Sequence, residues 1–137
     1  MKTLAAGLTI VCAFGLAACA TEYPVQWTAN LVTARIVVRE GNVRGITDVF
    51  SFEGRIFVYA TFTWEPGTRL GSQPIEVKWF NGETLISAQK STVDFTKTPY
   101  YVWGSTSGTA LGAGECRVEM YVNGKLAGRK DFTVTER

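Results

Sequence analysis

Few residues of this chain could carry out acid–base or nucleophilic chemistry. The 137-residue sequence contains no histidine, which removes the usual general base, the usual zinc ligand and every serine–histidine or cysteine–histidine pair. Ser105 and Ser107 lie in a run that lacks the Gly-x-Ser-x-Gly arrangement of a nucleophile elbow. Glu115 and Glu119 share one face of a predicted strand, where we expect them to keep the sheet soluble rather than to cleave glycosides. No run spaces oxygen ligands as a calcium loop does, so we expect no catalytic residue, no metal ligand and no cofactor.

Two groups of aromatic residues are better candidates, and both point to binding. The first group combines aromatic with charged side chains on the outward face of two predicted hairpins, as at the core and rim of a protein interface. Its members are Phe80, Tyr121, Lys78, Arg117 and Glu119, bordered by Glu76 and Arg129. The second group could stack on sugar rings beside a Gly/Ser/Thr-rich segment, and it consists of Tyr100, Tyr101 and Trp103. For both groups, ordinary cross-strand packing is the alternative interpretation.

Cys116 is the one cysteine of the predicted domain. A lone thiol in an oxidising compartment could pair between chains or react. However, Cys116 alternates with Val118, Met120 and Val122, which places it on an apolar strand face. We therefore expect a buried, unreactive thiol.

The elements that position these residues are predicted to be strands. Fourteen glycines, four prolines and many β-branched and aromatic residues favour β structure, and no helical periodicity is found after the N-terminal segment. The clearest strand is Arg55–Trp64, in which apolar and polar residues alternate. The other expected strands are Asn30–Arg39, Ile46–Phe50, Pro74–Phe80, Glu83–Lys90, Ser91–Asp94, Tyr100–Trp103, Glu115–Val122 and Lys125–Thr135. Residues 104–114 are expected to form a mobile loop, because they are rich in Gly, Ser, Thr and Ala.

Two Asn-Gly pairs predict hairpins, and the apolar pattern suggests their register. A two-residue turn at Asn123-Gly124 would pair Val122 with Lys125 and place Leu126 on the face of Tyr121. A three-residue loop would instead pair Met120 with Leu126. We favour the three-residue loop, because it collects Cys116, Val118, Met120, Leu126, Phe132 and Val134 on one face. The same choice at Asn81-Gly82 unites Val77, Trp79 and Leu85 on an inward face.

About seven strands separated by frequent turns predict an all-β, antiparallel two-sheet sandwich. The strand order resembles that of bacterial immunoglobulin-like modules over residues 31–135. Trp79 stands where a strand-C tryptophan would, and Cys116 lies near the place of a strand-F cysteine. The earlier strand has no partner cysteine, so no disulfide between the sheets is expected.

The N-terminal segment is typical of an export signal. Lys2 precedes an apolar run from Leu4 to Leu16, too short to cross a bilayer comfortably as a helix. The run Leu16-Ala17-Ala18-Cys19 resembles the lipobox of bacterial lipoproteins, which implies cleavage before Cys19 and acylation of its sulfur. Ala20 stands where an aspartate would resemble the inner-membrane retention signal, which implies sorting to the outer membrane. An ordinary signal peptide and an uncleaved membrane anchor are the alternatives.

These patterns predict residues 1–18 as signal peptide, residues 19–29 as lipidated N-terminus and short tether, and residues 30–137 as the sandwich. The formal net charge of +2, without a basic run, gives no sign of nucleic-acid binding. We expect a non-catalytic, outer-membrane-anchored lipoprotein, facing the periplasm, that binds or supports another envelope component, a protein. The alternative is a glycan-binding module for peptidoglycan or surface polysaccharide.

Overall fold

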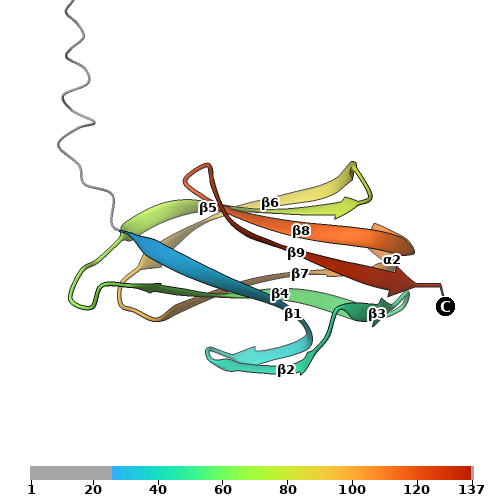
Figure 1. The fold of residues 1–137 in the computed structure, drawn as a ribbon, viewed down its shortest axis with the longest axis horizontal. Helices are drawn as coiled ribbons and strands as arrows, with labels where there is room; N and C mark the ends of the chain where they lie inside the picture. The colour runs from blue at the N-terminus through green and yellow to red at the C-terminus, as the bar shows by residue number, and fades with distance from the viewer. Residues whose placement is uncertain (1–25, 137) are drawn as a thin grey trace, which may run out of the picture.

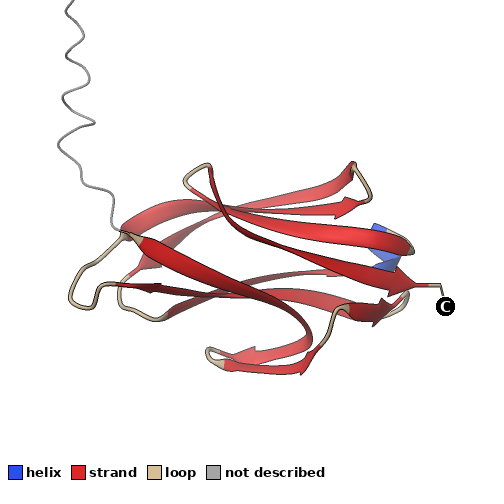
Figure 2. Ribbon diagram, viewed as in Figure 1, coloured by secondary structure: helices blue, strands red, loops and turns tan. Residues whose placement is uncertain are grey.

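Two packed sheets make up almost all of the described structure, residues 26–136 of a computed structural model (Figure 1, Figure 2). The elements are β1 (Trp27–Arg39), β2 (Asn42–Ile46), β3 (Val49–Ser51), β4 (Arg55–Trp64), β5 (Gly71–Asn81), β6 (Thr84–Phe95), β7 (Tyr100–Ser107), α2 (Gly108–Leu111), β8 (Gly114–Val122) and β9 (Lys125–Thr135). The predicted signal peptide, Cys19 and most of the tether lie outside the described residues. Within residues 26–136, no helix is long and apolar enough to cross a membrane.

The sheets have four and five strands. Their orders are β2-β1-β4-β7 and β3-β9-β8-β5-β6. All neighbouring strands are antiparallel except β3 and β9, which are parallel. The chain changes sheet five times, at β2–β3, β3–β4, β4–β5, β6–β7 and β7–β8. The all-β sandwich predicted from the sequence is therefore confirmed, with nine strands in the described residues instead of about seven.

Alternation along the strands builds the core between the sheets. On β4, Ile56, Val58 and Phe62 are almost fully buried, as their shared face predicts. Trp79 on β5 is completely buried at the centre and meets Phe132 of β9 edge-on, with 6.2 Å between ring centroids. Within residues 26–136, the buried core residues lie between Leu31 and Val134 and come from both sheets.

The indole nitrogen of the central tryptophan, Trp79, is hydrogen-bonded to a side chain of the neighbouring strand β6. The Trp79 indole N–H donates to Oε1 of Gln89 on β6 at 3.1 Å. Nε2 of Gln89 donates in turn to the Ser105 carbonyl on β7 at 3.0 Å, so one side chain joins the two sheets. No buried side-chain nitrogen or oxygen in residues 26–136 lacks a hydrogen-bond partner. This meets the requirement that buried polar groups be paired.

The β8–β9 hairpin corrects our predicted register. Its turn has two residues, because Asn123 and Gly124 both have positive φ (51° and 80°) and Val122 pairs with Lys125. Leu126 therefore lies opposite Tyr121 and is exposed rather than buried. A shift in register next to Met120, which pairs with Gly128, then returns the strand to the core. The prediction that Phe132 and Val134 face the core with Cys116 is confirmed.

The β5–β6 hairpin also differs from our prediction. Asn81 stays in β5 and pairs with Thr84, so the turn is centred on Gly82-Glu83. The Asn81 amide donates to the carbonyls of Leu111, Gly112 and Ala113 at 3.0–3.3 Å, which holds Asn81 in the strand. Leu85 consequently pairs with Phe80 and is half exposed, so its predicted inward position was wrong, whereas Val77 and Trp79 are buried as predicted.

Four segment boundaries also change. Ser91–Asp94 is the end of the long strand β6 and belongs to the five-stranded sheet, not to the opposite one. Residues 104–107 extend β7 and residues 108–111 form the short helix α2, so the predicted loop is largely ordered structure. The strand expected at Ile46–Phe50 is split into the end of β2 and β3. The first strand begins at Trp27 rather than at Asn30.

β1 and β2 form a hairpin at one edge of the four-stranded sheet, at the bottom of the view in Figure 1. At its turn, the backbone N–H of Gly41 donates to the Tyr59 hydroxyl on β4. A Cβ built on Gly41 would lie 3.8 Å from the Tyr101 ring. The hairpin therefore covers part of the outer face of β4 and β7.

Candidate functional site

The first predicted group lies on the outer face of the five-stranded sheet, as its alternation requires. On β8, Arg117, Glu119 and Tyr121 point to the same face, because they are two residues apart. Each pairs with an outward residue of β5: Phe80 with Arg117, Lys78 with Glu119, and Glu76 with Tyr121. The structure thus brings all five predicted residues together. We call this surface the β8 face; it consists of Arg117, Glu119 and Tyr121 of β8 with Lys78 and Phe80 of β5.

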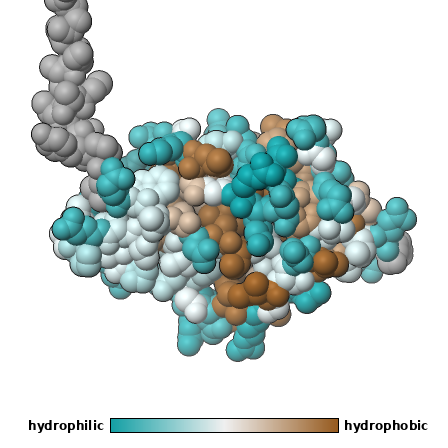
Figure 3. All heavy atoms as spheres, in the orientation of Figure 1, coloured by the Kyte–Doolittle hydropathy of each residue, from teal (hydrophilic) through white to brown (hydrophobic). Residues whose placement is uncertain are grey.

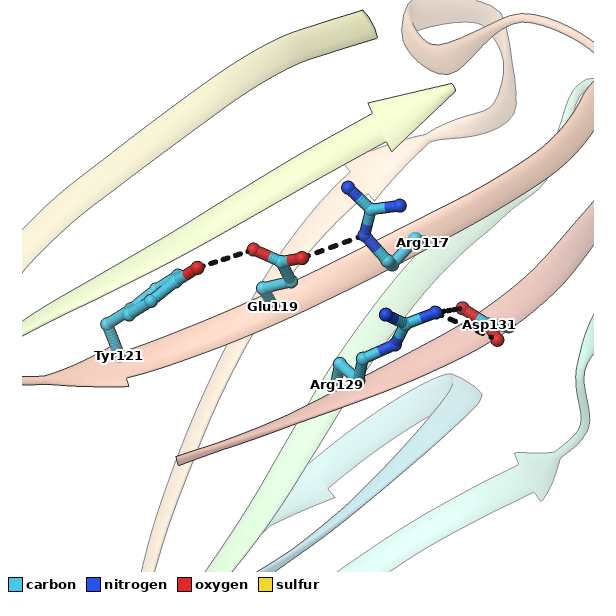
Figure 4. Close-up of polar contacts among 5 residues, drawn as sticks. All are labelled: Arg117, Glu119, Tyr121, Arg129 and Asp131. Atoms are coloured by element: carbon cyan, nitrogen blue, oxygen red, sulfur yellow. Dashed lines mark hydrogen bonds and ion pairs between the residues drawn. The ribbon is translucent and has the colours of Figure 1, made fainter. Parts of the chain in front are cut away.

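Hydrogen bonds fix the centre of this face, as Figure 4 shows. The Tyr121 hydroxyl donates to Oε1 of Glu119 at 2.6 Å, and Nε of Arg117 donates to Oε2 of the same carboxylate at 2.8 Å. The side chains of Glu119 and Arg117 are only 14% and 17% exposed. Such a covered, charge-assisted pair is more restrained than an isolated ion pair in open solvent. On β9, Arg129 and Asp131 form a separate ion pair at 3.1 Å that is well exposed.

Each aromatic ring of the β8 face carries a cation above it. Cζ of Arg117 lies 4.1 Å from the Phe80 ring centroid, and Nζ of Lys78 lies 4.8 Å from the Tyr121 centroid. Both distances are within the range of a cation–π contact. Phe80 pairs with Arg117 and Tyr121 pairs with Glu76, four residue pairs apart on the β5–β8 ladder, so the two rings lie on one face but in different rows. The face therefore alternates aromatic and charged groups.

The Glu119 contact changes the acidity of Tyr121. The hydrogen bond to Glu119 raises the pKa of the Tyr121 hydroxyl above its ordinary value of 10.0, and burial adds to the effect. The neutral phenol is favoured because a phenolate could not donate to the carboxylate and would be repelled by it. Tyr121 is therefore a hydrogen-bond donor throughout the physiological pH range.

An open depression of about 480 Å³ adjoins the β8 face. It is lined by Glu76 and Lys90, which pair across β5 and β6, and by Gly124 of the β8–β9 turn. The turn is held there by the Asn123 N–H, which donates to the Pro74 carbonyl at 2.8 Å. Both signs of charge line the depression next to Tyr121, the residue that pairs with Glu76.

The second predicted group is divided between the two faces of β7. Tyr100 packs inward against Phe95, with 5.4 Å between ring centroids. Tyr101 and Trp103 point outward and stack on Tyr59, at 5.6 Å and 5.7 Å. Trp103 is 41% exposed, whereas Tyr59 is buried. The rings of Tyr59, Tyr101 and Trp103 stack largely on one another, and of the three predicted residues only Trp103 is exposed.

The residues considered for chemistry have structural roles. Cys116 is buried and not disulfide-bonded, and burial, followed by the nearby Glu115 charge, raises the pKa of its thiol. Ser107 caps α2 by accepting a hydrogen bond from the Ala110 N–H at 3.1 Å. Within residues 26–136, no three His, Cys, Asp or Glu side chains are grouped to hold a metal ion.

Sequence reasoning missed three structurally important side chains, Gln89, Asn81 and Tyr59. Each acts through a partner distant in sequence, and a polar residue on a strand gives no local signal of such a partner. Sequence reasoning also found no concentration of basic charge, although Arg35, Arg39 and Arg44 occur within ten residues of one another on β1 and β2. The spacing of these arginines was the signal that could have revealed a basic surface on the β1–β2 hairpin.

Comparisons with known proteins identify the fold alone. No protein-family model and no curated protein matches this sequence. An immunoglobulin-like protein from Pseudomonas aeruginosa matches with a TM-score of 0.54 and 11% identity, over 82% of this chain and 99% of that chain. β-Glucosidases from Erythrobacter marinus and Listeria innocua match with TM-scores of 0.53 and 0.51 and identities of 8% and 10%. This chain covers only 16% of each β-glucosidase, so that likeness concerns one part of those enzymes. The described residues form an immunoglobulin-like β-sandwich.

Proposed function

We propose that this protein is an outer-membrane lipoprotein whose immunoglobulin-like sandwich binds or supports another envelope protein. The β8 face is the contact surface, and the observation that carries the proposal is its composition. Two aromatic rings, each covered by a cation, surround the nearly buried Arg117–Glu119 pair. Tyrosine, phenylalanine and arginine are the residue types enriched at the centres of protein interfaces.

The fixed geometry of the face supports this assignment. The Glu119 carboxylate already accepts hydrogen bonds from two neighbours, so little side-chain freedom is lost when a partner binds. The adjoining depression offers a place for one protruding side chain of the partner. The balanced charges favour a partner with a mixed polar surface over a nucleic acid.

Site-specific photocrosslinking in intact cells tests the contact surface. A photoreactive residue at Ala88, which is exposed and pairs with Lys78, should give a discrete crosslinked product that mass spectrometry identifies as an envelope protein. The same probe at Thr63, which is exposed on the four-stranded sheet, is the control. Equal products from both positions, or no product from Ala88, would contradict the proposal.

The lipid anchor rests on the lipobox resemblance and has a separate test. Cys19→Ser should abolish incorporation of labelled palmitate and release the protein from the membrane fraction. Persistent palmitate labelling of this variant would show that Cys19 is not the acylated residue. This outcome would leave the binding role of the sandwich unaffected.

Glycan binding is the second candidate, favoured by the exposure of Trp103 on the edge strand β7. An exposed tryptophan ring can stack on a sugar ring. In this case the protein should co-sediment with insoluble peptidoglycan, and Trp103→Ala should reduce the bound fraction. If the protein binds glycan through Trp103, Lys78→Glu should leave peptidoglycan binding unchanged. If the β8 face binds a protein, the same substitution should weaken that contact.

A further inference from the structure

The β1–β2 hairpin carries exposed apolar and basic side chains that neither the core nor the β8 face uses. Ile36, Val38 and Ile46 are 50%, 49% and 61% exposed, and all three belong to this one hairpin; grouped exposed apolar residues are more informative than single ones. Arg39 and Arg44 are also exposed. We call these five residues the hairpin patch. Figure 3 shows hydrophobic surface at the lower centre of the molecule, over this hairpin, with hydrophilic surface beside it.

The strand register places much of the patch on one face. Ile36 pairs with Arg44, and Ile46 pairs with Ala34, two positions further along the ladder. Residues two positions apart on a strand share a face, so Ile36, Arg44 and Ile46 point to the same side. Val38 lies where the register shifts and is also exposed. The hairpin is therefore amphipathic, with aliphatic and basic groups side by side.

The net charge of the protein equals the charge of this hairpin. Residues 35–46 contain three arginines and one glutamate, a formal charge of +2, and the whole chain is +2, so the remaining residues sum to zero. Elsewhere, Arg69, Arg117 and Arg129 each pair with a carboxylate. Among residues 26–136, no salt bridge joins Arg35, Arg39 or Arg44 to a carboxylate. The hairpin thus combines uncompensated positive charge with exposed aliphatic surface.

We propose that the hairpin patch docks on the surface of an anionic phospholipid membrane. Aliphatic side chains beside arginines match the boundary between acyl chains and negatively charged headgroups. A single hairpin on the outside of a sheet offers a small contact area, which suits a deformable lipid surface better than a protein interface of standard size. This role is independent of Cys19 acylation and of the β8 face, and it would orient the sandwich relative to the membrane.

Vesicle co-sedimentation of residues 20–137, which include every core residue found within residues 26–136 and lack the apolar leader, tests the proposal. The protein should bind phosphatidylglycerol-containing vesicles, not phosphatidylcholine vesicles, and less tightly as salt increases. Arg39→Gln with Arg44→Gln should weaken binding about fivefold for each arginine removed. Ile36→Ser with Val38→Ser should also weaken binding, with circular dichroism unchanged because both side chains are half exposed.

The matched control removes the same charge elsewhere, through Lys90→Gln with Lys97→Gln, both exposed positions. Binding should be unchanged in this control. An equal loss in the control would show a general charge effect and overturn the proposal, as would no binding of the unaltered protein. The proposal would also be overturned if the arginine variant bound vesicles as well as the unaltered protein does but associated with itself. The arginines would then serve to prevent edge-to-edge pairing at β2.

Discussion

Cys116 illustrates how a residue's environment decides its chemistry. The side chain is buried between the sheets, and burial raises its thiol pKa, so little thiolate is present at neutral pH. We predict that a bulky maleimide labels Cys116 only after denaturant unfolds the domain. Mass spectrometry of residues 20–137 with and without denaturant measures this. Rapid labelling of the folded protein, or a covalent dimer on a non-reducing gel, would be inconsistent with burial.

The Tyr121 hydroxyl should make stability depend on pH in the alkaline range. Its pKa is raised in the folded state, mainly by the Glu119 hydrogen bond, so its contribution is present below the ordinary value of 10.0 and is lost as pH rises through the raised pKa. The unaltered protein should therefore lose urea resistance above pH 10 more steeply than the Tyr121→Phe variant. Parallel urea titrations on both sides of this pH measure the difference, and identical slopes would contradict the assigned hydrogen bond.

Gln89 joins the two sheets through the central tryptophan. Gln89→Leu would leave the buried Trp79 N–H without its acceptor and remove the bond to the Ser105 carbonyl. We expect a loss of roughly 1–3 kcal/mol in the free energy of unfolding, the usual cost of leaving a buried polar group unpaired. Gln73→Leu, which removes a bond to the nearby Leu70 carbonyl, is the control and should cost less. Equal midpoints for Gln89→Leu and the unaltered protein would contradict this role.

At the scale of elements, the alternation of apolar and polar residues predicted the strand bounds and faces that depend on local sequence. It missed the features that depend on pairing with other strands. The bounds of β4 and the inward positions of Phe132 and Val134 follow directly from periodicity. The β9 register beside the turn did not, because the two-residue turn and the pairing shift next to Met120 together place Leu126 on the outer face. The long edge strand β6 was predicted as two strands, Glu83–Lys90 and Ser91–Asp94, because Phe95 is its only buried residue and no alternation shows that the run is continuous.

Asn81 shows how one side chain can connect two elements. Its amide donates to three carbonyls between α2 and β8, the end of a helix that has no basic residue in its last turn. Asn81→Ala should lower the free energy of unfolding by about 1–2 kcal/mol and speed amide hydrogen exchange at residues 111–114. Asn123→Gly, which suits a left-handed turn, should leave exchange in this segment unchanged. Unaltered exchange in Asn81→Ala would show that the segment is held by other contacts.

At the scale of the whole molecule, the two faces of the five-stranded sheet have different roles. Trp79 faces the core and is fully buried, so Trp79→Ala should cost about 3–5 kcal/mol. Tyr121 faces outward, so Tyr121→Ala should cost much less. Chemical denaturation compares the two variants, and equal shifts in midpoint would contradict the assignment of faces. The sequence placed both residues correctly, because each lies in a strand of clear alternation, whereas no sequence pattern identifies a partner for the outer face.

The most direct test of the proposed binding role is the yield of the Ala88 crosslink in cells expressing Tyr121→Ala. The account predicts that this product is strongly reduced although the variant remains folded and membrane-associated. Trp103→Ala, on the other sheet, should leave the yield unchanged. A Tyr121→Ala yield equal to that of the unaltered protein would show that the β8 face does not contact the partner.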